Sequence, residues 1–582
     1  MSVSALFQTH TVDNQAPPLA AYNAYASDTA LRAAVQREGG GWAEAHLTEF
    51  GAVAGGELMQ LGCTANEHKP KLRAFDRYGH RLDEVEFHPA YHRVMQLAMH
   101  YGVHAYAWRN AERSGAHVAR AALSYLHTQA EAGSGCPLTM THSAVPALRH
   151  APPLAARWLP KLTSYEYDPR VLPFEQKTAC TIGMGMTEKQ GGSDVRANTT
   201  RALRQADGSY EIVGHKWFFS APMCDAWLVL AYTDAGRRRH GDLREQAGAG
   251  GADEAGIRTH LAALGHRDAG LGCFLMPKLR PDGSLNAIRI QRLKDKLGDW
   301  SNASSEVEFH GAYAQAVGDE GRGVATILEM VALTRLDCMI GSSGLMRQAT
   351  VQAIHHAQHR KAFGKRLVEQ PLMQNVLADL ALESEAAMAL TLRVARAVDA
   401  SAHDAGEAAL ARIATAIGKF WICKRCPPLV NEAQECLGGA GYVEESNLPR
   451  LYRQAPLNSI WEGSGNIQCL DVLRAISKEP ETREAVFAEL LAARGENADL
   501  DRETQWLASA FDDRTTLELR SRMVVERLAL AMQAAILLRA GVADVAQTFC
   551  TTRLGGEHGL NFGTLPAPTP MAALIARAAV AA

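Results

Sequence analysis

The hydrophobic pattern of this 582-residue chain changes period twice, and this change limits the possible fold more than any other feature. Between residues 88 and 180, apolar residues recur at i, i+3, i+4 and i+7, which is the spacing of one helix face. From residue 201, short runs rich in β-formers take over, and turn signals such as Asp207-Gly208 separate them. Ala-rich helical repeats return between residues 323 and 478. The sequence therefore predicts a helical domain, a β domain and a second helical domain, in that order.

A polar stretch interrupts the β region between residues 234 and 270. It contains GRRRHGDLREQAGAGGADEAG, which has few apolar residues with which to form a core. Such a composition is typical of inserted loops without secondary structure. We therefore expect a mobile, disordered insertion here.

Composition excludes some classes of protein. The net charge of −3 gives no bulk attraction to nucleic acid or to an anionic membrane. No signal peptide and no uncharged apolar run of membrane-spanning length is found, so we expect a cytoplasmic protein without membrane spans. The 11 cysteines form no disulfide framework, which suits a reducing compartment. Cys423 and Cys426 form a CxxC, but without a second pair helix packing is the better interpretation, and no metal is expected.

One carboxylate stands in an unusual setting near residue 460. Glu462 in IWEGSGNIQCL follows Ile460 and Trp461 and precedes a Gly-Ser-Gly turn. Apolar neighbours raise the pKa of a carboxyl group, which suits a general base near neutral pH. Glycines let a ligand approach the backbone closely. Taken alone, the same string is equally consistent with an ordinary helix start.

A second candidate is the loop in TIGMGMTEKQGGSDV, residues 181 to 195. Its glycines, Ser193 and Asp194 suit a loop whose N–H groups and hydroxyl face a phosphate or a heteroaromatic ring. A dinucleotide fingerprint is excluded because GxGxxG must open a helix, whereas a strand-rich region follows here. Most glycine-rich loops are simple turns, so this loop gains meaning only from its neighbours.

Taken together, these segments resemble the acyl-CoA dehydrogenase superfamily of FAD flavoproteins. The similar motifs are MTEKQGGSDV, KWFFSAP, RKAFGK, LGGAGY and IWEGSGNI, in the family's order across roughly residues 90 to 478. Within the superfamily, the AidB branch of the alkylation response is most similar. Its marks are QTHTVDNQAPPL near the start, EFHPAYH, LKDKLG with SNAS, and an extra segment after Lys478.

The resemblance implies a multidomain α+β fold with four parts. Residues 1–180 would form an N-terminal extension and α domain, and residues 181–318 a β-barrel-like domain. Residues 319–478 would form a four-helix bundle, and residues 479–582 an additional helical domain, which the resemblance to the AidB branch associates with DNA binding.

The resemblance also implies an FAD site and assigns its residues. Glu462 falls on the position of the catalytic base, and the helix through Thr334 and Arg335 offers no alternative carboxylate. The implied cofactor-binding residues are Met184, Met186, Thr187, Gly192, Ser193, Phe218, Ser220, Arg360, Phe363, Gly438, Gly439, Trp461, Ser464 and Asn466. In the family, the segment matching Arg360 and Phe363 reaches the FAD of a neighbouring subunit. A homotetramer built as a dimer of dimers is therefore implied.

Some positions depart from the family pattern. Ala332 and Leu333 stand where many members carry polar residues for CoA, and Trp461 replaces a common Tyr, which should narrow the acyl pocket. Asp299 and Trp300 stand where the family is expected to have a polar residue followed by Arg, and Glu435 stands where relatives often have a Gln. FAD binding follows from the motifs, whereas rapid turnover of an acyl-CoA does not.

Three functions are compatible with these observations. The first is an AidB-type flavoprotein that associates with double-stranded DNA, protects against alkylation and has weak dehydrogenase activity. The second is a functional acyl-CoA dehydrogenase for short or branched acyl groups. A nitroalkane-oxidising enzyme would use an Asp base, which position 462 lacks. The DNA association rests on resemblance alone: residues after 481 are not net basic, and Arg520 and Arg527, at i and i+7, equally suit a solvated helix face.

Overall fold

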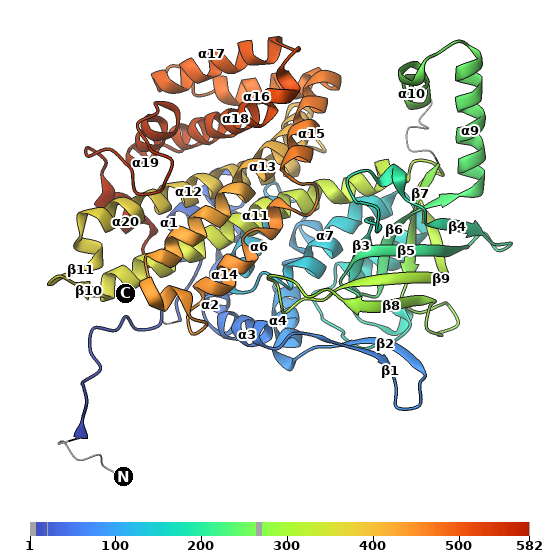
Figure 1. The fold of residues 1–582 in the computed structure, drawn as a ribbon, viewed down its shortest axis with the longest axis horizontal. Helices are drawn as coiled ribbons and strands as arrows, with labels where there is room; N and C mark the ends of the chain where they lie inside the picture. Colours follow the sequence, from blue (N-terminus) through green and yellow to red (C-terminus); the bar gives the residue numbers. More distant parts are fainter. Residues whose placement is uncertain (1–6, 20, 264–269, 581–582) are drawn as a thin grey trace.

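The computed structural model describes residues 7–19, 21–263 and 270–580. It starts with a helical part in which a small hairpin is inserted (Figure 1). The helices are α1 (Thr29–Arg37), α2 (Glu44–Ala54), α3 (Glu57–Glu67), α4 (Pro89–His100), α5 (Tyr106–Arg109), α6 (Ala116–Ala130), α7 (Gly135–Arg149) and α8 (Pro152–Leu162). The hairpin pairs β1 (Lys71–Phe75) with β2 (Arg81–Glu86). The expected N-terminal helical domain is thus present.

The β domain is one seven-stranded sheet. Its strands are β3 (Ile182–Gly185), β4 (Arg201–Arg204), β5 (Tyr210–Ser220), β6 (Ala226–Thr233), β7 (Leu271–Pro277), β8 (Ile288–Leu293) and β9 (Ser304–Val317). The order β3-β6-β4-β5-β9-β7 closes on itself because β6 also pairs with β7, and β8 pairs with β9. The barrel-like domain implied by the motifs is confirmed.

The insertion between β6 and β7 differs from our expectation. It contains α9 (Asp234–Ala249) and α10 (Glu254–Ala263), which project away from the sheet (Figure 1). Thr233 caps α9 by accepting a hydrogen bond from the backbone N–H of Gly236 at 2.9 Å, and Asp234 lies in the first turn. The prediction of a segment without secondary structure was therefore wrong. The Arg, Glu, Gln and Ala residues of this segment favour a helix although they form no apolar stripe. The Thr233 cap stabilises the first turn of that helix.

A helical bundle follows, built around one long central helix (Figure 1). Its elements are α11 (Gly323–His359), the hairpin of β10 (Lys361–Ala362) and β11 (Lys365–Arg366), α12 (Pro371–Ala400), α13 (Ala405–Glu435), α14 (Leu448–Gln454) and α15 (Gly465–Lys478). The buried residues of α11 lie on all of its faces, because other helices and the β domain cover it. Cys423 and Cys426 are both buried on α13, as expected for helix packing.

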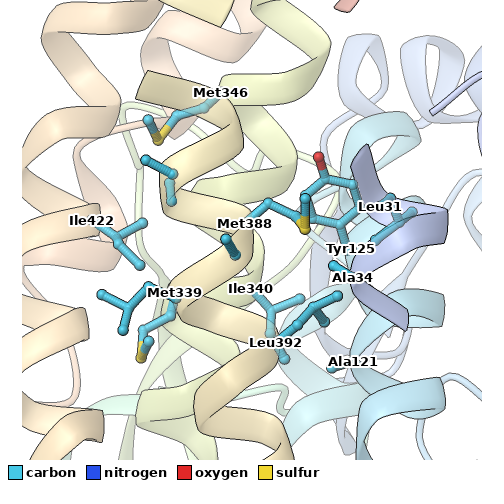
Figure 2. Packing of buried hydrophobic residues seen from close by; sticks show 14 of the residues in the cluster. Leu31, Ala34, Ala121, Tyr125, Met339, Ile340, Met346, Met388, Leu392 and Ile422 are labelled. Atoms are coloured by element: carbon cyan, nitrogen blue, oxygen red, sulfur yellow. The ribbon is translucent and has the colours of Figure 1, made fainter. Parts of the chain in front are cut away.

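The main core joins the bundle to the N-terminal helices. Figure 2 shows Ile340 of α11 and Met388 and Leu392 of α12 on the side of Tyr125 of α6 and the helix α1, whereas Met339 of α11 lies on the side of Ile422 of α13. The β domain has a separate core that includes Trp227 and Phe219. The chain is therefore organised around two cores, and α11 contributes to both.

The C-terminal helices cover the outer side of α12 and α13 (Figure 1). They are α16 (Pro480–Leu491), α17 (Ala498–Asp512), α18 (Leu517–Ala540), α19 (Ala543–Phe549) and α20 (Met571–Ala578). Buried ion pairs hold this part in place, for example Arg553 with Glu383 at 3.0 Å. None of the helices within the described residues is long and apolar enough to cross a membrane.

Candidate active site

A cavity of about 1810 Å³ lies where the β domain meets the bundle. Among the segments that line it are the loop after β3, the first third of α11 (residues 324–335) and the turn before α15. Ten of the residues proposed from the sequence share this lining: Met184, Met186, Thr187, Gly192, Ser193, Phe218, Ser220, Trp461, Glu462 and Ser464. The structure therefore brings the glycine-rich loop and the Glu462 segment to one site.

Strand alternation explains the part that β5 plays. Phe218 and Ser220 lie two residues apart on β5 and both line the cavity. The ring of Phe218 is 50% exposed, although it is a large apolar side chain inside a fold. Trp217, the residue before Phe218 on β5, does not line the cavity; the ammonium group of Lys294 lies 3.4 Å from its ring centroid.

The glycine-rich loop is held from behind by one buried carboxylate. Glu188 is fully buried and accepts hydrogen bonds from Lys216 Nζ at 2.9 Å and from the backbone N–H groups of Thr199 and Thr200. The side chain of Gln190 also donates to Glu188. Burial alone would raise the pKa of Glu188, but Lys216 and these hydrogen bonds lower it to about 2. An ionised Glu188 therefore fixes both ends of the loop.

Sequence reasoning missed this ion pair. Glu188 lies inside the motif MTEKQGGSDV and Lys216 begins KWFFSAP, so the two motifs proposed for the flavin are joined by a buried salt bridge. The two adjacent hydroxyl residues Thr199 and Thr200, which also donate to Glu188, are a further sequence feature that could have indicated this buried carboxylate.

The candidate base lies in a strained and firmly held turn. Glu462 has a φ of 58°, in the left-handed region that a residue with a Cβ seldom adopts. Its backbone carbonyl accepts from Arg335 Nε at 2.9 Å and from Gln468 Nε2 at 3.1 Å. Its Oε2 accepts from the hydroxyl of Thr334 at 2.8 Å. Backbone strain that is maintained by such contacts is typical of functional sites.

The surroundings of Glu462 tune its protonation. Burial raises the pKa of its carboxyl group above the usual range. The Thr334 hydrogen bond and the positive charges of Lys419 and Arg335 oppose this rise without cancelling it. A carboxylate with a raised pKa is a stronger proton acceptor, which is what a general base requires.

Four of the departures from the family pattern line the cavity, namely Ala332, Leu333, Trp461 and Asp299, whereas Trp300 and Glu435 do not. Trp461 lines it beside Ala332 and Leu333, and its indole N–H donates to Asn458 Oδ1 at 2.9 Å. Asp299 lies in the same wall, and burial raises its pKa to about 6. Trp300 is instead held between the cations of Lys69 and Arg453.

Five proposed residues do not line the cavity of their own chain: Arg360, Phe363, Gly438, Gly439 and Asn466. Arg360 donates to the backbone carbonyl of Asn14, and the ring of Phe363 is 98% exposed. The side-chain oxygen of Asn466 accepts from Arg522 at 2.9 Å. Roles for these residues in binding the cofactor stay predictions.

Comparison with known proteins identifies the family. Residues 14–169 match the adaptive response protein AidB N-terminal domain, residues 183–247 the acyl-CoA dehydrogenase middle domain, and residues 321–477 the acyl-CoA dehydrogenase C-terminal domain. AidB of Escherichia coli (strain K12) is 47% identical over 557 residues, which cover 95% of this chain and 96% of that protein. The chain belongs to the AidB branch of the acyl-CoA dehydrogenase family. It is therefore an FAD-dependent oxidoreductase of the acyl-CoA dehydrogenase type, as the motifs implied.

Other members of the family are similar over much of their length. Acyl-CoA dehydrogenase family member 11 of Caenorhabditis elegans is 32% identical over 440 residues, 74% of this chain and 66% of that protein. The crystal structure of C. elegans ACDH-11 in complex with C11-CoA has a TM-score of 0.80 at 26% identity and covers 95% of both chains. An acyl-CoA dehydrogenase of Bacillus anthracis complexed with FAD shares the fold, with a TM-score of 0.58 at 17% identity.

The cavity of this AidB-type protein fits the flavin of its family. A Cβ on Gly192 would lie 2.5 Å from the Thr187 hydroxyl, so the loop leaves no room for a side chain there. Large apolar side chains stay open along the cavity wall, including Phe218, Leu297 and Leu328, as a planar aromatic ring requires. Thr187, Ser193 and Ser220 provide hydroxyl groups beside them.

Proposed function

We propose that this protein oxidises an acyl-CoA thioester with Glu462 as the base that removes the α-proton. The observation that carries the proposal is the carboxylate of Glu462 in the wall of the flavin-sized cavity, buried and with a raised pKa. When bound, FAD supplies the oxidant that accepts a hydride from the β-carbon. The residues proposed to hold its ring are those of the loop at 184–193 together with Phe218 and Ser220.

Two groups of Glu462 would act on the substrate, and the hydroxyl of Thr334 would act on Glu462. The backbone N–H of Glu462 donates to no acceptor within the described residues and is available to polarise the thioester carbonyl. This polarisation acidifies the α-proton, which the Glu462 carboxylate accepts. The hydroxyl of Thr334 lies within 2.8 Å of Glu462 Oε2 and 3.0 Å of the Val331 carbonyl. The hydroxyl can donate its single proton to the ionised carboxylate of Glu462. Once Glu462 is protonated, the hydroxyl can donate to the Val331 carbonyl instead.

The substrate we propose is a short or branched acyl-CoA. Trp461 and Leu333 occupy the wall beside the base, where they shorten the space for an acyl chain. The relative ACDH-11 was crystallised with C11-CoA, which supports a CoA thioester as the ligand class. Because the identity to that protein is 26%, its chain length is a starting point for a substrate panel only.

Glu462→Gln tests the proposal, because it keeps the shape and removes the proton acceptor. FAD should stay bound, while flavin reduction by an acyl-CoA panel should fall by about 10²- to 10⁴-fold in stopped-flow absorbance. Equal rates for wild type and variant would remove Glu462 from the reaction. A wild-type protein that retains FAD and that no acyl-CoA reduces would contradict the acyl-CoA dehydrogenase activity itself.

Association with DNA and protection against alkylation are a second proposal, which rests on membership of the AidB branch. The C-terminal arginines named above do not support it: Arg520 pairs with Asp513 at 3.0 Å, and Arg527 pairs with Glu503 and stacks on Trp506. Retention of double-stranded DNA should decrease steeply with salt if phosphates are bound. Absence of retention at low salt would leave the oxidoreductase as the function of this chain.

We also propose a homotetramer with flavin sites shared between subunits. The exposed ring of Phe363 at the tip of the β10–β11 hairpin supports a contact beyond the chain, since such a large apolar side chain gains from being covered.

A further inference from the structure

A buried lysine lies behind the catalytic turn. Lys419 of α13 is 1% exposed, and its Nζ donates to the carbonyls of Asn458 at 3.0 Å and Gly463 at 2.8 Å. These two carbonyls flank Trp461 and Glu462. One ammonium group therefore joins the two ends of the turn that carries the candidate base.

The environment of this lysine is unusual for a buried charge. The other deeply buried lysine near the cavity, Lys216, is neutralised by Glu188 at 2.9 Å. Lys419 forms no salt bridge with any carboxylate among the described residues. Burying an unpaired ammonium group is strongly unfavourable, so backbone carbonyls must compensate it. A Leu or Met would pack at this helix position without that cost. The presence of a lysine therefore indicates a functional role for its hydrogen bonds to the turn that carries Glu462.

The same turn is connected to three helices. Asn458 donates from Nδ2 to Ser342 of α11 at 3.2 Å and accepts from the Trp461 indole. Gln468 of α15 donates to the carbonyls of Glu462 and Gly463. Lys419 adds the connection to α13.

Lys419 differs from the second nearby cation. Arg335 also bonds the Glu462 carbonyl, but its charge is engaged by Asp471 at 2.8 Å, and Asp471 is shared with Arg412. No carboxylate in the described part of the chain pairs with Lys419, and its positive charge lowers the pKa of Glu462.

We propose that Lys419 is a positioning residue that holds Glu462 in its left-handed backbone conformation and, as the buried cation behind that turn, favours its carboxylate form for proton abstraction. The proposal deepens the proposed function and rests on it for its kinetic part. Its geometric and electrostatic part concerns the protein alone and can be measured without a substrate.

The groups that face Glu462 come from four helices. Thr334, Arg335 and Cys338 belong to α11, Cys136 to α7 and Lys419 to α13, while Asp471 of α15 acts through Arg335. Burial keeps the pKa values of both thiols raised, so Cys136 and Cys338 stay neutral. Removing the charge of Lys419 should raise the pKa of Glu462 further, because a nearby cation favours the ionised carboxylate.

The decisive experiment titrates Glu462 by infrared difference spectroscopy in the FAD-loaded protein without substrate. The carboxyl band of Glu462 is assigned by its loss in Glu462→Gln. In Lys419→Met the midpoint of this band should move to higher pH, and in Lys419→Arg, which keeps charge and donors, it should stay close to wild type. Arg425→Met, on the same helix but paired with Glu383, is the matched control and should leave the midpoint unchanged.

The kinetic readout is flavin reduction across pH. Lys419→Met should be about ten- to a hundredfold slower above its midpoint, since a misplaced base loses rate even when ionised, and its profile should shift in the same direction as the infrared midpoint. An unchanged infrared midpoint together with an unchanged profile would overturn the proposal. Wild-type protein that is not reduced by any acyl-CoA would refute the proposed function, while the infrared titration would still decide the role of Lys419. If Lys419→Met does not fold, Lys419→Gln, which keeps donors without charge, takes its place.

Discussion

At the scale of single residues, burial and nearby charges have opposite effects on the protonation of Glu462. Burial favours the protonated carboxyl, whereas Thr334, Lys419 and Arg335 favour the carboxylate. Since burial is the largest influence, the pKa of Glu462 stays raised. The base form exists only above this pKa, so flavin reduction should slow as pH falls through it.

Thr334→Val gives a graded test of this balance. It preserves size and removes the hydrogen bond to Oε2, so the pKa of Glu462 should rise and the pH profile of flavin reduction should move to higher pH. Thr334→Ser, which retains the hydroxyl group, is the control and should keep the wild-type profile. A Val variant with an unshifted profile would show that the hydroxyl does not contact the base in solution.

Trp461 should set the length of the acyl group. Trp461→Ala opens the cavity wall beside the base, so longer acyl chains should reduce the flavin faster while short chains lose contacts. The ratio of kcat/KM for long and short acyl-CoA should therefore increase. The double variant with Glu462→Gln should stay inactive for every chain length, because added space does not replace a proton acceptor.

At the scale of elements, the loop after β3 depends on the buried pair of Glu188 and Lys216. Glu188→Gln leaves the ammonium group buried without a counter-charge, which typically destabilises a protein by about 3–5 kcal/mol. The loop should loosen, and the affinity for FAD should fall in a flavin fluorescence titration. A Gln variant with unchanged FAD affinity would show that the loop is ordered by other contacts. Arg577→Met, which removes a distant ion pair with Glu385, is the control for general destabilisation.

The same pair predicts how acid acts on the protein. The pKa of Glu188 in the fold is lowered to about 2, below that of an unfolded glutamate at about 4.3. Its stabilising contribution is therefore fully present above the unfolded pKa and is lost as pH falls from there toward about 2.

Whether a helix, strand or loop can be predicted from the sequence depends on whether local patterns or contacts between distant residues determine it. The order of helices and strands follows from apolar periodicity, and the glycine-rich loop and Glu462 from local motifs. The pairing of Glu188 with Lys216 and the bonds of Lys419 join residues distant in sequence, so no local pattern indicates them. The inserted α9 has no apolar face and therefore gives no periodic signal, so the Thr233 cap is the local feature that marks its start.

At the scale of the whole molecule, binding of FAD and assembly should be linked. If Arg360 and Phe363 contact the flavin site of a neighbour, each equilibrium strengthens the other. Arg360→Ala should then weaken FAD retention and shift the tetramer toward smaller species in analytical ultracentrifugation. Lys365→Ala, on the same hairpin, is the control. A tetrameric Arg360→Ala protein with full flavin content would show that Arg360 serves only to bind Asn14 within its own chain.

The left-handed backbone of Glu462 implies a trade-off between stability and activity. Glycine adopts this conformation without strain, whereas a residue with a Cβ loses about 1 kcal/mol there. Glu462→Gly and Glu462→Ala both remove the carboxylate and its bond to Thr334, so their difference isolates the strain. The Gly variant should unfold at a higher temperature than the Ala variant, although both are inactive. The position would then be one at which the chain gives up folding stability for catalysis.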